Sequence, residues 1–181
     1  MHCTNLATFH QATGNGFKLS NGEPKATRMA DRDLALRFFA FRQGDWKTLY
    51  TESESLDAFL FSIIKRIDGM SQDELSLEMQ AFEAAMENAY RLFDGNAFRR
   101  WPLGGRKGPL NRSLFESWAV ALSEVNWADL ELRKDVIVTE MRRRMLEDKQ
   151  YIDSFTIATT DLSRVENRFK FARDILMGRP S

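Results

Sequence analysis

The chain has 181 residues, 43% of them hydrophobic, and carries 26 Lys plus Arg residues against 26 Asp plus Glu residues. A chain of this length usually forms one domain and can bury a core without disulfides. Its formal net charge of zero argues against a surface that attracts nucleic acid everywhere. Any affinity for phosphate must therefore come from a local cluster of cations.

The sequence indicates a soluble protein of a reducing compartment. Cys3 is the single cysteine, which excludes an internal disulfide and fits the cytosol. The N-terminus lacks the apolar run of a secretory signal, and the longest apolar stretch, AFLFSII, is far shorter than the roughly 20 residues that cross a bilayer. We expect a cytoplasmic location and no membrane partner.

Residues 1–27 have no apolar periodicity and contain turn-forming Asn-Gly pairs, which predicts an irregular N-terminal segment. His2, Cys3 and His10 lie in this segment and could in principle bind a metal ion. A zinc site needs a fourth ligand, and three ligands in a loose terminus are weak support for one. We therefore predict an ordinary terminus and no metal site.

From Arg28 onward, apolar residues recur at helical spacing, and no convincing pair of strands is present. The pattern predicts an all-α fold, a single compact bundle of about seven helices forming one helical domain over 28–178. Glycines end several segments, and Ser71 with Glu74 forms a capping box. The expected helical segments, in chain order, are 28–43, 54–68, 71–94, 113–125, 130–148, 150–160 and 162–178.

The helical body offers no catalytic centre and no cofactor site. It contains no histidine, so neither a Ser/His/Asp nor a Cys/His arrangement can form there. The phosphate-binding patterns G-x-x-x-x-G-K-[ST] and G-x-G-x-x-G are also absent. Glu116 stands beside Phe115 and Trp118 on an apolar helix, which favours a buried partner for an arginine over acid–base work. A metal-dependent catalytic fragment built on Asp and Glu is the least favoured alternative.

The stretch RRWPLGGRKGPLNR, residues 99–112, is basic, lacks acidic residues and is rich in Gly and Pro. It could bind DNA phosphates, with glycines that allow close approach, backbone N–H groups facing an anion, and Trp101 stacked on a base. The alternative is a solvated connector, and the residues alone favour this alternative. The candidate nucleic-acid-binding residues are Arg99, Arg100, Trp101, Arg106, Lys107 and Arg112.

A second basic run, RRRM at residues 142–145, is flanked by Glu140, Glu147 and Asp148. Charges of both signs on one helix are typical of a solvated surface. We therefore expect residues 142–144 to lie on an exposed helix face.

Four blocks of sequence carry a resemblance to a known family. RMADRDLALRFFAF, YTESESLDAFLFSIIK, FRRWPLGGRKGPLNRSLFESWAVALS and DSFTIATTDLSRVENRFKFARDIL occur in this order. Over roughly residues 28–176 the series resembles the C-terminal helical region of GmrSD-type restriction proteins, also known by their ParB/sulfiredoxin-like D-G-Q-Q-R nuclease domain. The resemblance implies a bacterial phage-defence system in which nucleotide-dependent endonucleases restrict foreign DNA.

The family's catalytic parts have no counterpart here, since D-G-Q-Q-R is absent and no HNH-type histidines follow. The resemblance therefore implies a non-catalytic helical accessory region that supports a nuclease domain and contacts DNA through residues 99–112. It also suggests that Arg168 pairs with buried Glu116, and that Asn111 caps a helix. The alternative is a protein-interaction module, a regulator or subunit that pairs with a full-length family member without binding DNA. The matching positions are Arg37, Phe38, Phe98, Arg99, Trp101, Pro102, Asn111, Leu114, Phe115, Glu116, Arg168 and Phe169.

Overall fold

The computed structural model of the chain describes residues 28–179, and over this range it is a compact all-helical domain, as predicted. The one β feature in the same range is an isolated bridge between Arg99 and Leu110. The helices are α2 (Arg28–Arg42), α3 (Trp46–Glu52), α4 (Leu56–Asp68), α5 (Gln72–Phe93), α6 (Arg112–Ser123), α7 (Trp127–Glu131), α8 (Lys134–Glu147), α9 (Lys149–Thr156) and α10 (Leu162–Met177).

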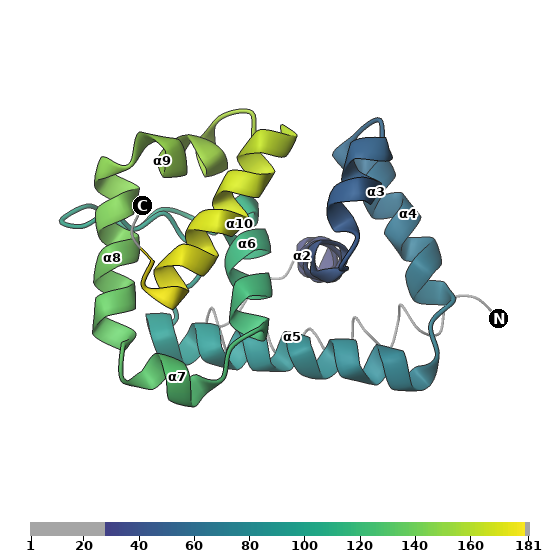
Figure 1. The fold of residues 1–181 in the computed structure, drawn as a ribbon, viewed down its shortest axis with the longest axis horizontal. Helices are drawn as coiled ribbons and strands as arrows, with labels where there is room; N and C mark the ends of the chain where they lie inside the picture. Colours follow the sequence, from purple (N-terminus) through teal and green to yellow (C-terminus); the bar gives the residue numbers. More distant parts are fainter. Residues whose placement is uncertain (1–27, 180–181) are drawn as a thin grey trace.

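Helix α6 is the centre of the domain. It contacts α2, α5, α9 and α10, and Figure 1 shows it between the end-on α2 and the left-hand group of α8 and α9, with the long α5 crossing below. Every residue from Ser113 to Leu122 is buried. A helix that is buried on all sides belongs to the core rather than to a surface layer. Any charged side chain on it therefore needs a partner.

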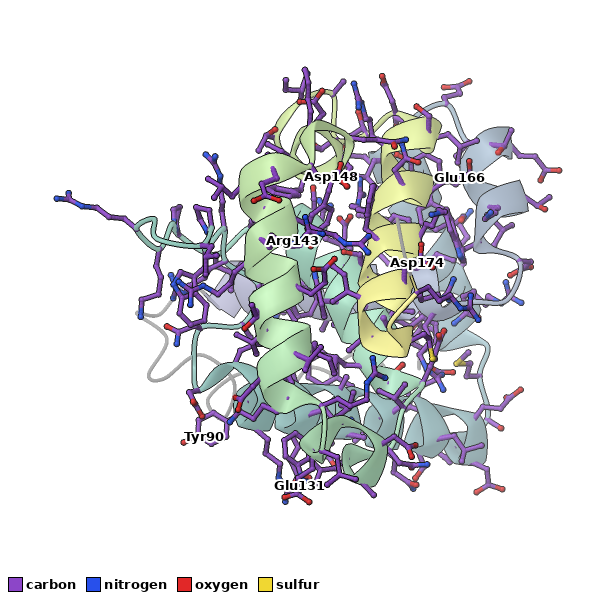
Figure 2. All side chains as sticks on the ribbon, turned by 60° about the vertical axis from the view of Figure 1, so that its left-hand side comes forward. Tyr90, Glu131, Arg143, Asp148, Glu166 and Asp174 are labelled. Atoms are coloured by element: carbon purple, nitrogen blue, oxygen red, sulfur yellow. The ribbon has the colours of Figure 1, made fainter. Side chains whose placement is uncertain are left out.

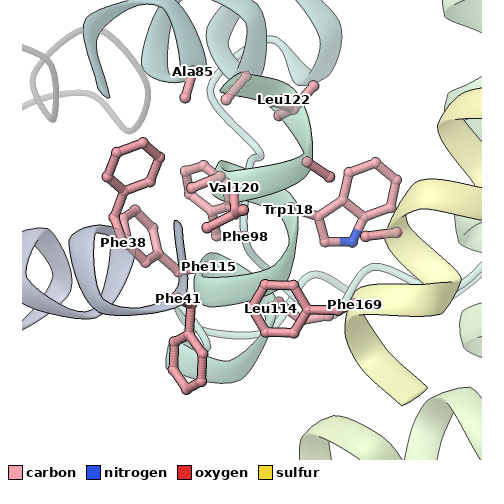
Figure 3. Close-up of a cluster of buried hydrophobic side chains, with 14 of the residues drawn as sticks. Phe38, Phe41, Ala85, Phe98, Leu114, Phe115, Trp118, Val120, Leu122 and Phe169 are labelled. Atoms are coloured by element: carbon pink, nitrogen blue, oxygen red, sulfur yellow. The ribbon is translucent and has the colours of Figure 1, made fainter. Parts of the chain in front are cut away.

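Aromatic rings fill the space around α6 (Figure 3). Phe38 of α2 meets Phe82 of α5 edge to face at 5.1 Å between ring centroids. Phe98 meets Phe115 of α6 in the same way at 4.9 Å. Full burial of one such side chain stabilises the fold by roughly 1.5–3 kcal/mol. The predicted core positions Phe38, Leu114, Phe115, Trp118 and Phe169 are all buried.

The predicted helix ends are largely confirmed. Ser71 and Glu74 form the capping box at the start of α5, and Gly69 is the C-cap of α4. Helix α5 ends at Phe93, one residue before the predicted end at position 94, because Asp94 takes the left-handed conformation with φ of 47°.

Two short helices were not predicted. Helix α3 begins two residues after Gly44, with Asp45 at its N-cap, and its buried residues are Trp46 and Tyr50. Helix α7 is separate from α8, whereas the sequence predicted one segment over 130–148. The apolar pattern breaks there because Leu130 is buried whereas Leu132 is 93% exposed.

The prediction of an exposed face at residues 142–144 was wrong for Arg144. Helix α8 lies beside α10 (Figure 2) and also contacts α5 and α9. Successive residues on a helix point in directions about 100° apart, so one of three consecutive arginines must face these neighbours. That residue is Arg144, which is 1% exposed, whereas Arg142 and Arg143 are partly exposed.

Candidate nucleic-acid interface

Residues 99–111 form a closed, hairpin-like loop between α5 and α6. Asn111 N–H donates to Phe98 O at 2.8 Å, and Gly108 N–H donates to Arg100 O at 2.8 Å. These bonds hold the two arms together next to the bridge between Arg99 and Leu110. In Figure 1 the loop is the teal segment that extends beyond α8 at the left.

The tip of the loop is a tight turn over residues 102–105. Gly105 N–H donates to Pro102 O at 3.0 Å, and Gly104 has a φ of +71°. A positive φ at this third turn position favours glycine. Leu103 N–H donates to Arg142 O at 3.0 Å, which anchors the tip on α8. The glycines thus set the shape of the turn.

The backbone N–H groups at positions 103, 105, 108 and 111 are occupied by these hydrogen bonds. These four groups are therefore not available to an anion. At the start of α6, Asn111 Oδ1 accepts from Leu114 N–H at 2.9 Å, and Asn111 Nδ2 donates to Phe155 O at 3.0 Å. The predicted capping role of Asn111 is confirmed. The charged groups that the loop presents to an anion are its side chains.

The loop cations lack acidic partners. Arg99, Arg100, Arg106 and Lys107 form no ion pair with any carboxylate in the described part of the chain. Arg99 Nη1 donates to Gly108 O at 3.2 Å, and Lys107 Nζ donates to Asn96 Oδ1 at 2.7 Å. Both contacts orient the side chain and leave its charge uncompensated.

Arg112 differs from the other predicted binding residues. Its Nε lies 3.2 Å from Asp33 Oδ2, so its charge is partly balanced. Arg112 is exposed at the start of α6, but the structure places it in an ion pair with α2 rather than with the loop cations.

Trp101 is half-buried and packs against cations. The guanidinium carbon of Arg142 lies 4.1 Å from the ring centroid, and Lys107 Nζ lies 5.6 Å from it. Cations are attracted to the face of an indole ring. Arg142 and Lys107 therefore already contact the ring that the sequence suggested for stacking on a base. In the structure, the Trp101 ring holds two cationic side chains close to the loop.

Arg142 was not predicted as part of this site. It forms no ion pair with a described carboxylate, and its contact with Trp101 brings it to the loop. The sequence offered little indication of this contact, since Trp101 and Arg142 are about 40 positions apart and Arg142 is flanked by acidic residues. We name Arg99, Arg100, Arg106, Lys107 and Arg142 the loop cation cluster.

Glu116 is buried with two arginines, as its apolar surroundings indicated. Arg168 Nη2 donates to Glu116 Oε2, and Arg37 Nη1 donates to Glu116 Oε1 at 2.6 Å. Arg168 also donates to Thr159 O at 2.7 Å, and Arg37 Nε to Asp33 Oδ2 at 2.9 Å. The expected pairing of Glu116 with Arg168 is present, and Arg37 is an additional partner.

The charges of this network stabilise one another. Burial alone would lower the pKa of Arg37, but Glu116 and then Asp33 outweigh it and raise that pKa. Both carboxylate oxygens of Glu116 accept hydrogen bonds from guanidinium groups, so neither is free for acid–base catalysis. The network joins α2, α6 and α10 and is structural.

Trp118 is buried in α6, and its indole Nε1 donates to the Tyr151 hydroxyl at 2.9 Å. Burial raises the pKa of Tyr151 well above its usual range, so the hydroxyl stays neutral at physiological pH. The contact joins α6 to α9 through two side chains that have no access to solvent.

Across residues 28–179 no group of three or more His, Cys, Asp or Glu side chains is arranged to hold a metal ion. The ligands considered from the sequence, His2, Cys3 and His10, lie outside the described residues. None of the described helices is long and apolar enough to cross a membrane.

Comparison of the chain with protein-family models, with curated proteins and with solved structures finds no match.

Proposed function

We propose that this chain is a non-catalytic helical accessory region that binds DNA phosphates through the loop cation cluster. The observation that carries the proposal is the absence of carboxylate partners for these five neighbouring cations, while most other described cations pair with acids. Arginine and lysine side chains of this kind contact phosphate oxygens irrespective of base sequence.

The geometry supports binding at the backbone of DNA rather than base readout. The loop is held to α8 by Leu103 and closed by its own hydrogen bonds, so it presents its cations from a fixed frame. The Trp101 ring is engaged by Arg142. We propose affinity that falls with salt and varies little with DNA sequence.

From the resemblance described above we propose that this activity belongs to a GmrSD-type restriction system. In that setting the chain would be a bacterial, cytoplasmic phage-defence component that supports a nuclease domain while its loop holds the DNA. In this proposal the nuclease chemistry belongs to the partner domain or subunit, because D-G-Q-Q-R is absent from this sequence.

A second candidate is a protein-interaction module without DNA binding. It is favoured by apolar side chains exposed near the α7–α8 junction and the end of α10. Leu132 is 93% exposed, Val136 65% and Met177 50%. Exposed apolar groups that cluster on a surface mark interaction sites. Such a module would pair with a nuclease domain or a full-length relative.

Binding to a fluorescent DNA duplex separates the two candidates. The test variant replaces Arg100, Arg106 and Lys107 with Ala, because these three loop cations are exposed. The matched control replaces Lys47, Lys65 and Arg66, cations of the same total charge on α3 and α4.

We expect the native chain and the control to bind with similar affinity at low salt, and the loop variant to bind at least about tenfold more weakly, the effect of a loss of roughly 1.4 kcal/mol. Equal binding by the loop variant and the control, or no binding by the native chain, would contradict the proposal. The latter result would favour the interaction module.

A further inference from the structure

A second basic site lies away from the loop, between α8 and the C-terminal end of α10. A hollow of about 430 Å³ opens there. Figure 2 labels Arg143 on α8 and Asp174 on α10, which border it. Its charged lining consists of four guanidinium groups and two carboxylates, from Arg133, Arg143, Arg144, Arg179, Glu140 and Asp174.

Both carboxylates already have partners. Glu140 accepts hydrogen bonds from Arg143 at 2.8 and 2.9 Å and from Arg144 at 2.6 Å. These bonds, first those from Arg143, lower the pKa of Glu140 to about 2. Asp174 accepts from Lys170 at 2.7 Å. The charges of Glu140 and Asp174 are therefore already balanced by Arg143, Arg144 and Lys170.

Two arginines of the lining remain without an acid. Among the described residues, Arg133 and Arg179 form no ion pair. Arg133 Nη1 donates to Leu176 O at 2.8 Å, a carbonyl near the end of α10. This bond orients the guanidinium group and does not balance its charge.

Arg144 supplies the observation that points to a ligand. Its side chain is 2% exposed, it lines the hollow, and its Nη1 has no hydrogen-bond partner among the described residues. Its other nitrogens are used, since Nε donates to Glu140 and Nη2 donates to Arg179 O at 3.1 Å. A buried charged donor without an acceptor is destabilising, so an acceptor is expected there.

The backbone at the end of α10 is shaped to keep Arg133 in place. Gly178 has a φ of +69°, and a Cβ at this position would lie 2.5 Å from Arg133 Nη2. The left-handed turn favours glycine at this position, and the absence of a Cβ leaves room for the guanidinium group packed against it.

We propose that this hollow binds the phosphate group of a small molecule. Guanidinium groups match the planar spacing of phosphate oxygens and donate to them in pairs. The excess of positive charge in the lining suits a group that carries about −1.5 to −2 at neutral pH. The hollow, together with the three arginines Arg133, Arg144 and Arg179 that line it, is called the α8–α10 phosphate site.

Calorimetric titration of the full chain with sodium phosphate, at constant ionic strength set with sodium chloride, tests this site. We expect saturable binding of one phosphate per chain. At about ten times the Kd, the unfolding midpoint should rise by roughly 3–6 °C. The absence of a saturable signal overturns the proposal.

Three variants locate the binding. Arg179→Ala removes an exposed group of the lining and should weaken phosphate binding about tenfold. Arg144→Lys keeps the positive charge but loses the paired N–H donors of the guanidinium group, and it should weaken phosphate binding similarly. Circular dichroism verifies that this variant is folded. Arg173→Ala is the matched control, since Arg173 lies on α10, pairs with Glu124 and does not line the hollow.

If Arg179→Ala and Arg144→Lys bind phosphate as the native chain does, the proposal is wrong and the arginines only cap α10. The loop variant with Arg100, Arg106 and Lys107 replaced should bind phosphate normally. This result separates the α8–α10 phosphate site from the proposed DNA contact, since either can fail without the other. Addition of a short DNA duplex to the phosphate-bound chain tells whether the site binds the DNA backbone or a free small molecule. If the duplex displaces phosphate from the native chain, and this displacement is lost in Arg179→Ala, the small-molecule assignment is wrong.

Discussion

Arg168 donates a hydrogen bond to Glu116 across 52 positions of sequence, and both side chains are 1% exposed. Arg37, from a third helix, donates to the other oxygen of the same carboxylate. One buried acid thus ties α2 and α10 to the central helix α6. The arrangement explains how a helix buried on all sides can carry a charge.

Replacing Glu116 should be among the most damaging single changes in the domain. Glu116→Leu leaves two buried guanidinium groups without their carboxylate and is expected to lower the free energy of unfolding by about 3–5 kcal/mol. Urea denaturation followed by circular dichroism measures it. The control Glu166→Leu removes an exposed partner of Lys47 and should change stability by less than about 1 kcal/mol. Similar effects of the two changes would contradict the structural role of Glu116.

Asn111→Ala should destabilise the domain by about 1–2 kcal/mol through the loss of the α6 cap. The side chain accepts from Leu114 N–H and also donates to Phe155 O, so the change affects α6 and the end of α9 together. Thermal unfolding measures the loss. Asn111→Asp keeps the cap acceptor and should recover part of it. If Asn111→Asp is no better than Asn111→Ala, the cap contributes little.

The Trp118–Tyr151 contact should be visible in stability and fluorescence. Tyr151→Phe leaves the buried indole N–H without an acceptor, which costs about 1–3 kcal/mol. Trp118 emission should shift as its hydrogen bond is lost. The control Tyr90→Phe alters an exposed tyrosine and should be neutral. Unchanged unfolding of Tyr151→Phe would mean that the indole finds another partner.

Glu140 should give stability a measurable dependence on acid pH. Its folded-state pKa is about 2, below the ordinary 4.5, because Arg143 and Arg144 bind its charged form. The contribution is therefore complete above pH 4.5 and is lost as pH falls towards 2. Glu140→Gln should flatten the stability profile in this window, measured by urea unfolding at several pH values. A parallel profile for Glu140→Gln and the native chain would contradict this assignment.

The sequence predicted the helical fold because most segments combine a long apolar stripe with a recognisable cap. The same reasoning predicted a buried partner for Glu116, since an acid among aromatic side chains must be paired. It did not find Arg37, which lies 79 positions from Glu116 on a helix with charges on other faces. Long-range pairs of this kind depend on how helices cross.

The loop and α8 show what sequence patterns cannot resolve. Glycines in residues 99–112 suggested backbone N–H groups free for an anion, whereas Gly104 and Gly105 shape a turn, and the N–H groups of Gly105 and Gly108 are bonded within the loop. Three consecutive arginines looked alike, yet Arg142 contacts Trp101, Arg143 binds Glu140 and Glu147, and Arg144 is buried beside α10. Their different roles follow from tertiary packing.

The most direct test of the proposed DNA contact is the slope of log K against log salt for a short duplex, measured for the native chain and for Arg106→Ala. Each phosphate contact releases counterions, so loss of one contact should reduce the slope by about 0.9. We predict that reduction for Arg106→Ala and none for the control Arg66→Ala, whose charge is paired with Asp45. Identical slopes for the native chain and Arg106→Ala would contradict the assignment of the loop as a phosphate-binding element.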